Sequence, residues 1–333
     1  MKTIDSAKHF IGCDVSKDTL DFALYEKGKD YRMFNHIQVS NNKEGYRDMR
    51  KWLKWLGLDV KAACIGMEHT GSYTVEFSRW CSEHNIIFVL LHPLDVKNAG
   101  ARGRNKDDKT DSRFIADYVY TMREKLIPSK PECPKISKLR MLRNERALAV
   151  KTRTAYINQM KSHTTEGSDI RFRKLIRMFD EQIKSIEKEI VRVIKSDESL
   201  KRNFDLLLTL RGIGIVNALM TIVATGNFTR FQTARQYAKY ACVSPLSNQS
   251  GISIKKGNHV SKAGHSEIKS VLTEGARSAI VYDSQLKAYY ERKRKEGKSH
   301  GCVMNAIKFK LICRMFAVIK RQSPYVEIEK FRA

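Results

Sequence analysis

Four acidic residues in the first third of the chain most restrict the fold that it can adopt. They are Asp14 in IGCDVSKDTLDFAL, Glu68 in IGMEHTGSY, and Asp108 with Asp111 in NKDDKTDSRFIADY. Each acid follows an apolar stretch typical of a strand or begins a stretch typical of a helix. A single acid of this kind is usual at a strand end or a helix cap. Together, the four predict carboxylates that converge to hold a divalent metal beside a phosphate.

The stretches around these acids alternate between strand and helix patterns. Strands are predicted over residues 9–15, 19–25, 31–39, 62–67 and 86–91. Helices are predicted over residues 42–56, 72–84 and the segment that contains Asp108 and Asp111. Asn41 or Asn42 can cap the first helix, and Gly57 stops it. The predicted order is therefore β-β-β-α-β-α-β-α, an α/β domain.

The residue types at the four acidic positions favour one class of metal. Asp108 and Asp111 are three residues apart, so on a helix they share a face. Hard cations take oxygen ligands, and a pair of them can stabilise both the attacking and the leaving oxygen of a phosphodiester. The sequence has no Cys or His spacing typical of zinc and no Gly-rich phosphate loop before a helix. We therefore expect Mg²⁺ or Mn²⁺.

The composition predicts a nucleic-acid partner. Lys and Arg number 62 against 36 acids, a formal net charge of +26, and such an excess favours binding to a polyanion, either DNA or RNA. The 333 residues, 42% of them hydrophobic, suffice for two or three packed domains. No apolar run approaches the roughly 18 residues of a membrane span, so we expect no membrane partner. Seven cysteines without paired spacing predict reduced thiols, most of them in the core, and a cytoplasmic protein.

A cluster of prolines predicts the first domain boundary. Pro128, Pro131 and Pro134 interrupt the pattern, and we predict domains over residues 1–127, 128–200 and 201–333. Two long helices are predicted over residues 135–162 and 170–195. In the second, apolar residues recur every three or four positions, as in the seam of a coiled coil. The pair is either a hairpin that packs only on itself or an arm that forms a dimer.

The last third is predicted to be mostly helical and to contact nucleic acid. Gly212 and Gly214 lie in a pattern that resembles a helix-hairpin-helix, whose turn amides can approach a phosphate. A segment rich in Ser, Gly and Lys follows, and its residue types alone favour a solvated, phosphate-binding loop between two helices. Further helices are predicted over residues 263–281, 284–296 and 300–320. The cations expected to contact nucleic acid are Lys255, Lys256 and Lys262, together with Arg102, Arg104 and Lys106 beside the proposed metal site.

Motifs in both halves of the chain resemble one family. The N-terminal motifs are Asp14, the string EHTG that begins at Glu68, and the string KDDKTDS that contains Asp108 and Asp111. The C-terminal motifs are Gly212-Ile213-Gly214, Pro245, Ser250-Gly251 and Ser261-Lys262-Ala263-Gly264. In this order they resemble transposases of the insertion-sequence family one-ten, the DEDD recombinases that include the Piv-type DNA invertases. The resemblance covers nearly the whole chain.

The resemblance implies a fold and a reaction. The order of elements and acids resembles the ribonuclease H fold in its Holliday-junction-resolvase form. By the resemblance, Ser250 attacks a DNA phosphate to form a covalent phosphoserine, with Ser247 as an alternative nucleophile, and the four acids hold magnesium. A structured bridge RNA that pairs with donor and target DNA is the further partner implied. Because a helical arm separates the acids from the serine, we expect the site to be completed between protomers of a dimer or tetramer.

The sequence is also compatible with two other functions. In a metal-dependent, junction-resolving nuclease the acids hydrolyse DNA with water, and Ser250 only contacts phosphate. In a non-catalytic nucleic-acid-binding protein the acids are structural. The recombinase needs both the acids and Ser250, the nuclease needs only the acids, and the binding protein needs neither.

Overall fold

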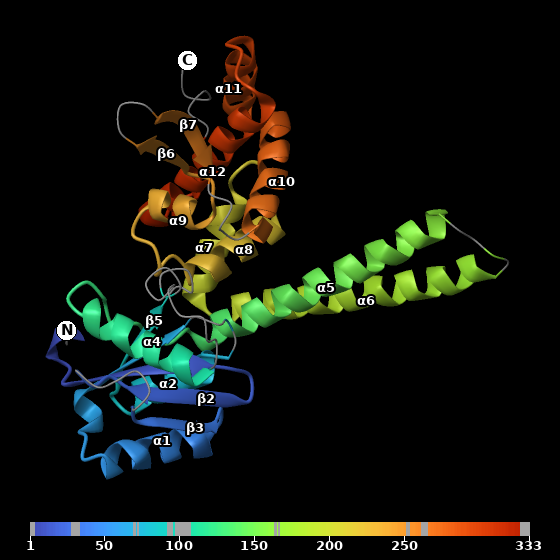
Figure 1. The fold of residues 1–333 in the computed structure, drawn as a ribbon. Helices are drawn as coiled ribbons and strands as arrows, with labels where there is room; N and C mark the ends of the chain where they lie inside the picture. The colour runs from blue at the N-terminus through green and yellow to red at the C-terminus, as the bar shows by residue number, and fades with distance from the viewer. Residues whose placement is uncertain are drawn as a thin grey trace. The chain divides into compact units, whose positions relative to one another are not determined.

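The chain divides into two compact units, residues 1–132 and 133–333, in a computed structural model (Figure 1). The structure describes residues 4–27, 34–68, 71, 73–91, 96, 108–162, 165, 167–250, 254–260 and 266–326. Each unit is described by itself. The predicted division into three domains stays a prediction.

The first unit is built on a mixed five-stranded sheet with the strand order β3-β2-β1-β4-β5. The strands are β1 (His9–Val15), β2 (Thr19–Leu24), β3 (His36–Ser40), β4 (Ala63–Glu68) and β5 (Ile87–Leu91). The first three form an antiparallel meander, and β4 and β5 continue the sheet parallel to β1. This arrangement confirms the ribonuclease-H-like sheet. The third strand is shorter than predicted, and part of the predicted range, residues 31–33, lies outside the described residues.

Helices cover both faces of this sheet (Figure 1). They are the α-helices α1 (Lys43–Trp55), α2 (Val75–Glu83) and α4 (Asp108–Thr121), with short 3₁₀ helices over Ile4–Ser6 and Val60–Ala62. The Asn42 side chain caps α1 by accepting from the amides of Glu44 and Gly45 at 3.0 Å, and Gly57 follows the helix with a φ of +73°. Ile11, Cys13 and Val15 of β1 belong to the core on the α1 and α2 side. Phe10, Ile115 and Val119 form the core on the α4 side.

The second unit begins with a helical hairpin made of α5 (Pro134–Ser162) and α6 (Ser168–Lys195). Ion pairs join the two helices, among them Arg146 with Glu187 at 2.8 Å and Arg153 with Asp180 at 2.5 Å. Ile186, Ile190 and Val193 of the predicted apolar seam are buried in the main core of the unit. The hairpin is thus confirmed as two packed helices, and its action as a coiled-coil arm stays a prediction.

The rest of the second unit is a helical domain with one small sheet. Its helices are α7 (Glu198–Leu208), α8 (Ile215–Thr225), α9 (Ala234–Tyr240), α10 (Ser266–Tyr282), α11 (Ser284–Lys295) and α12 (His300–Arg321). The segment before α10 was predicted as a solvated loop, and that prediction is wrong. It contains an antiparallel pair, β6 (Pro245–Ser250) and β7 (Ile254–Val260). Cross-strand backbone hydrogen bonds decide this structure, and the polar composition that suggested a loop does not report them.

All seven cysteines are free thiols, and four of them, Cys13, Cys64, Cys81 and Cys242, are buried. Burial raises the pKa of Cys64 to about 12, so this thiol stays protonated and acts as a small apolar side chain. Among the residues that the structure describes, no helix is both long and apolar enough to cross a membrane.

Candidate functional site

The structure places two of the four acids on adjacent strands and the other two on one helix. Asp14 lies on β1 and Glu68 is the last residue of β4. These strands are parallel neighbours, and the pair Cys13 and Met67 precedes the two acids in register. Asp108 and Asp111 lie in the first turn of α4.

Two glycines show that Asp14 and Glu68 face α4. A Cβ added to Gly12 would lie 1.9 Å from the carbonyl oxygen of Ser112, and one added to Gly66 would lie 2.1 Å from Cγ2 of Val119. Helix α4 therefore crosses β1 and β4 at the two glycines. Since side chains alternate along a strand, the residue two positions after each glycine points to the same face. Those residues are Asp14 and Glu68.

The same contact fixes the position of the helical acids. Ser112, whose carbonyl meets Gly12, directly follows Asp111. The N-terminus of α4 carries a partial positive charge that favours acids in its first turn. Asp14, Glu68 and Asp111 are all half-buried. The sheet thus places Asp14 and Glu68 on the face that α4 covers, and the helix places Asp111 directly before its contact with Gly12.

A buried arginine attaches this helix to the sheet. Arg113 is 3% exposed, and its guanidinium donates to the carbonyl oxygens of Leu24 at 2.5 Å and Glu26 at 3.3 Å. It also pairs with Asp117 one turn along the helix, at 3.4 Å. Arg113 follows Asp111 by two residues, so these contacts hold the acidic end of α4 against the end of β2.

The donor chemistry of the face fits a hard divalent cation, since the predicted ligands are carboxylate oxygens. The Asp14 carboxylate accepts a hydrogen bond from the Val15 amide at 3.0 Å. The side chain of Asp108 lies outside the described residues. Within the described part of the chain, no three His, Cys, Asp or Glu side chains are grouped closely enough to hold a metal ion. The metal site therefore stays a proposal that depends on Asp108.

A fifth acid on this face, Asp21, was not predicted from the sequence. Asp21 lies directly across from Asp14 on the neighbouring strand and is only 3% exposed. Its carboxylate accepts hydrogen bonds from Nε2 of His36 at 2.9 Å and from Nε2 of Gln38 at 3.0 Å. The two donors lie on β3 and satisfy a buried charge that would otherwise destabilise the fold. The sequence contains one signal for the position of Asp21. Side chains alternate between the two faces along β2, which places Asp21 on the face opposite to Leu20 and Phe22.

The predicted residues of the second unit are not brought to one described site. Ser250 ends β6 and pairs in register with Ile254, and Lys255 and Lys256 follow on β7. The side chains of these four residues lie outside the described set. So do all atoms of four other predicted cations, namely Arg102, Arg104, Lys106 and Lys262.

The two glycines of the predicted helix-hairpin-helix differ in their surroundings. Gly212 has a φ of +86°, and a Cβ there would lie 2.5 Å from the carbonyl oxygen of Gly275 on α10. Close packing against α10 therefore accounts for this glycine. Gly214 precedes α8, and a Cβ there would meet nothing within 4 Å. Phosphate binding by either glycine stays a prediction, and the open side of Gly214 leaves more room for it.

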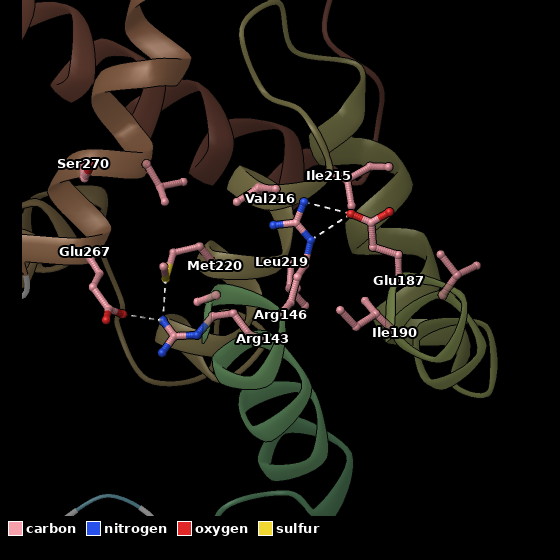
Figure 2. A pocket seen from close by; sticks show the side chains of 13 residues that line it. Arg143, Arg146, Glu187, Ile190, Ile215, Val216, Leu219, Met220, Glu267 and Ser270 are labelled. Carbon is pink, nitrogen blue, oxygen red and sulfur yellow. Dashed lines mark hydrogen bonds and ion pairs between the residues drawn. The ribbon is translucent and has the colours of Figure 1, made fainter. Parts of the chain in front are cut away.

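A cavity of about 290 Å³ lies in the second unit, at the root of the helical hairpin (Figure 2). Its wall is mostly apolar and includes Ile190, Leu219 and Val271. Two ion pairs cross its rim, Arg143 with Glu267 at 3.4 Å and Arg146 with Glu187 at 2.8 Å. Burial lowers the pKa of Arg143. None of the predicted site residues lines this cavity, and its ion pairs link α5 to α10 and α6.

Comparison with known proteins identifies two family domains. Residues 11–167 match a family model described as "Transposase", of the DEDD type named for IS110, and residues 204–291 match one described as "Transposase IS116/IS110/IS902 family". The pilin gene-inverting protein of Moraxella bovis is 26% identical over 331 residues, which cover 96% of this chain and 98% of that protein. The transposase for insertion sequence element IS1111A of Coxiella burnetii is 24% identical over 308 residues, which cover 80% of each chain.

Proposed function

The chain belongs to the IS110 family of transposases, enzymes that cleave and join DNA. We propose that it cleaves and joins DNA with four acids and one serine. The acids are Asp14, Glu68, Asp108 and Asp111, and the serine is Ser250. The observation that carries the proposal is the pair of glycine contacts, which place Asp14 and Glu68 on the sheet face that α4 covers. A structural role alone does not require three half-buried acids on one face.

In the proposed reaction, the hydroxyl oxygen of Ser250 forms a bond to a DNA phosphorus. The bond from that phosphorus to a deoxyribose oxygen breaks, and this oxygen leaves with a proton equivalent to the one that the serine loses. A DNA hydroxyl then attacks the phosphoserine, which joins the strands and restores the serine. Both steps conserve the number of phosphodiester bonds, so joining needs no external energy source.

The four acids would hold Mg²⁺ or Mn²⁺ in this proposal. When bound, such an ion neutralises charge on the phosphate and favours the ionised form of a nearby hydroxyl. The residues of the chain itself position the reaction: α4 sets the acids over the sheet, and the β6–β7 pair presents Ser250 at its end. Asp21 with His36 and Gln38 would hold the sheet beside Asp14 in a fixed geometry.

The test is covalent attachment of the protein to DNA carrying its native flanking sequence, in Mg²⁺ and total cellular RNA. We expect attachment by the wild type and none by Ser250→Ala or Asp14→Ala. Ser247→Ala is the matched control, because Ser247 lies on the same strand and should leave attachment unchanged. Cleavage without attachment that survives Ser250→Ala would instead support the nuclease.

The DNA outcome and the partners are further parts of the proposal. The pilin gene-inverting protein matches over 98% of its length, which favours DNA inversion as a second outcome of the same chemistry. A plasmid with two inverted copies of the flanking sequence distinguishes inversion from insertion. A guide RNA would suit the net charge of +26, because backbone-binding cations need base pairing to choose a sequence. Dependence of attachment on the added RNA tests this partner.

We further propose that the active enzyme is a homodimer or homotetramer whose protomers share the reaction. Mixing inactive Asp14→Ala and Ser250→Ala proteins tests this directly. Recovered attachment supports sharing between protomers, whereas full activity of the wild type at dilutions where it is monomeric excludes it.

A further inference from the structure

Lys308 of α12 is a buried cation in the core of the second unit. It is 6% exposed, and its neighbours Ile307 and Leu311 are fully buried in the same core. Its ammonium donates to Oγ1 of Thr273 on α10 at 3.4 Å. Thr273 in turn donates to the carbonyl oxygen of Lys269 at 2.7 Å, which leaves its oxygen free to accept from the lysine.

Among the described residues, the surroundings of Lys308 supply more positive charge and no neutralising acid. Burial, and then the nearby Lys269, lower the pKa of Lys308. The described acids nearest in sequence on α10 face other partners, since Glu267 pairs with Arg143 at 3.4 Å and Glu274 with Arg277 at 2.8 Å. Both carboxylates are mostly exposed. The connection to α10, residues 244–265, contains no Asp or Glu at all.

A second cation on α12 is paired with a buried acid, Asp283, directly before α11, which makes the contrast informative. Arg314, six residues further along α12, contacts the buried carboxylate of Asp283 at 2.6 Å. A charge held out of water destabilises a protein unless an opposite charge and hydrogen bonds offset the loss of hydration. The chain therefore supplies an opposite charge for Arg314. Among the described residues it supplies none for Lys308.

A neighbour of Lys308 on α12 contacts the segment that leads into the strand of the proposed nucleophile. Asn305, three residues earlier and on the same face of α12, donates from Nδ2 to the carbonyl oxygen of Val243 at 2.6 Å. Val243 lies two residues before the start of β6, and Ser250 ends that strand. Thr273 and Lys269 are half-buried, so the ammonium of Lys308 ends at the border between core and surface. An anion that contacts Thr273 and Lys269 can therefore approach this ammonium.

We infer that Lys308, with Thr273 and Lys269, binds a phosphodiester of the DNA substrate beside the β6–β7 pair. The inference rests on the proposed function, since it assumes that DNA is the substrate and that Ser250 attacks it. The phosphate supplies the negative charge that the chain lacks at this position. The ammonium and the Thr273 hydroxyl supply two donors, and Lys269 adds a second cation. Binding here holds the strand at the root of the element that presents Ser250.

The test measures the DNA dissociation constant by fluorescence anisotropy between 50 and 200 mM salt, for wild type, Lys308→Met and Thr273→Val. Loss of one phosphate contact lowers the salt slope of log K by about 0.9 and weakens binding about tenfold. We expect this change for Lys308→Met and a smaller loss of affinity, at an unchanged slope, for Thr273→Val. Lys310→Met is the matched control, because Lys310 lies on the same helix over the ring of Tyr289, 4.5 Å from its centroid.

The unfolding temperature separates phosphate binding from a structural role. A buried cation without an acid destabilises the free protein, so Lys308→Met should melt at the same temperature as the wild type or higher. A lysine that only supports α10 would lower the melting temperature when replaced and leave the salt slope unchanged. Unchanged slope and affinity in Lys308→Met, or an equal loss in Lys310→Met, would overturn the inference.

Two further outcomes keep this inference apart from the proposed function. If the wild type itself fails to bind DNA, the proposed function fails. If the wild type binds and Lys308→Met binds equally well, only the phosphate site fails. The same titration with single-stranded RNA completes the test, since a loss confined to RNA would overturn the assignment to DNA.

Discussion

Replacing Gly12 with alanine should push α4 away from the sheet and disturb the acidic face. The added Cβ would lie 1.9 Å from the carbonyl oxygen of Ser112 and 2.4 Å from the amide nitrogen of Ala116. Both atoms belong to the helix backbone, so neither can rotate aside. Real Cβ contacts are not closer than 3.0 Å, and the helix must therefore move by about 1.1 Å.

This displacement gives the size of the two expected effects. Overpacking of a tight contact destabilises a protein by about 1–3 kcal/mol. Asp111 directly precedes Ser112 and moves with it, while Asp14 stays on β1. A misplacement of about 1 Å in a reacting site can reduce the rate about 100-fold. Gly12→Ala should therefore lose both stability and DNA attachment per folded molecule.

Gly66→Ala is the matched control for this change. Its added Cβ would meet the methyl carbon Cγ2 of Val119 at 2.1 Å, and the next atom, on Ile115, at 3.3 Å. Both are side-chain atoms, so rotation about χ1 can relieve part of the overlap, whereas the backbone atoms that face Gly12 cannot rotate aside. The entropy that alanine removes from the unfolded chain, about 0.4–1 kcal/mol, is common to both variants and cancels in the comparison.

The assay is urea unfolding of both variants, followed by DNA attachment normalised to folded protein. Gly12→Ala should unfold at lower urea than Gly66→Ala and attach far less DNA. Equal losses in the two variants would refute the reasoning, because they would show that the helix backbone is not held by the Gly12 contact.

Four other predictions concern single interactions. Asp21→Ala leaves His36 and Gln38 without their acceptor and should lower the free energy of unfolding by about 1–3 kcal/mol, measured in urea; an unchanged midpoint would exclude a structural role for this network. Chelation of divalent cations should abolish DNA attachment and added Mg²⁺ or Mn²⁺ should restore it, whereas attachment in the chelator would contradict the metal proposal. Asp283→Ala leaves the half-buried Arg314 without its acid and should destabilise the protein by about 1–3 kcal/mol, in contrast to Lys308→Met; an unchanged free energy of unfolding would argue against the contrast between the two cations. The hydrogen bond from the Leu200 amide and the nearby Lys135 lower the pKa of Asp197, so its contribution is present at neutral pH and is lost as the pH falls through this lowered pKa; Asp197→Ala should lose about 1 kcal/mol at neutral pH and approach the wild type in acid, and a pH-independent difference would contradict this sign.

The sequence predicts the first unit well because the residues that begin and end its helices and strands act locally. β1 has the predicted bounds, and Asn42 and Gly57 limit α1 as predicted. A cap and a stop residue act through hydrogen bonds to their own helix, so a short window of sequence contains the information. The acids at the strand ends follow from the same local pattern.

The residues that the sequence did not reveal depend on distant partners. Asp21 alternates with Leu20 and Phe22 as a solvent-facing residue would, and its donors lie 15 and 17 residues away on β3. Gly12 and Gly66 have no unusual φ that marks them, and their reason is the approach of α4 about 100 and 50 residues later. The β6–β7 pair resembles a loop in composition because its polar and Gly-containing sequence has little strand propensity, and its pairing rests on backbone hydrogen bonds.

The position of the two glycines links the stability of the first unit to its chemistry. Each glycine lies two residues before an acid, so the contact that packs α4 also sets the distance between the strand acids and the helical acids. A variant that moves the helix must change both properties, whereas Asp14→Asn keeps the packing and removes only a charge. If activity fails in Asp14→Asn at wild-type stability, and fails together with stability in Gly12→Ala, the acids act as a set whose geometry the helix determines. If Gly12→Ala instead keeps its activity despite lost stability, the helical acids do not need that geometry and the proposed metal site is wrong.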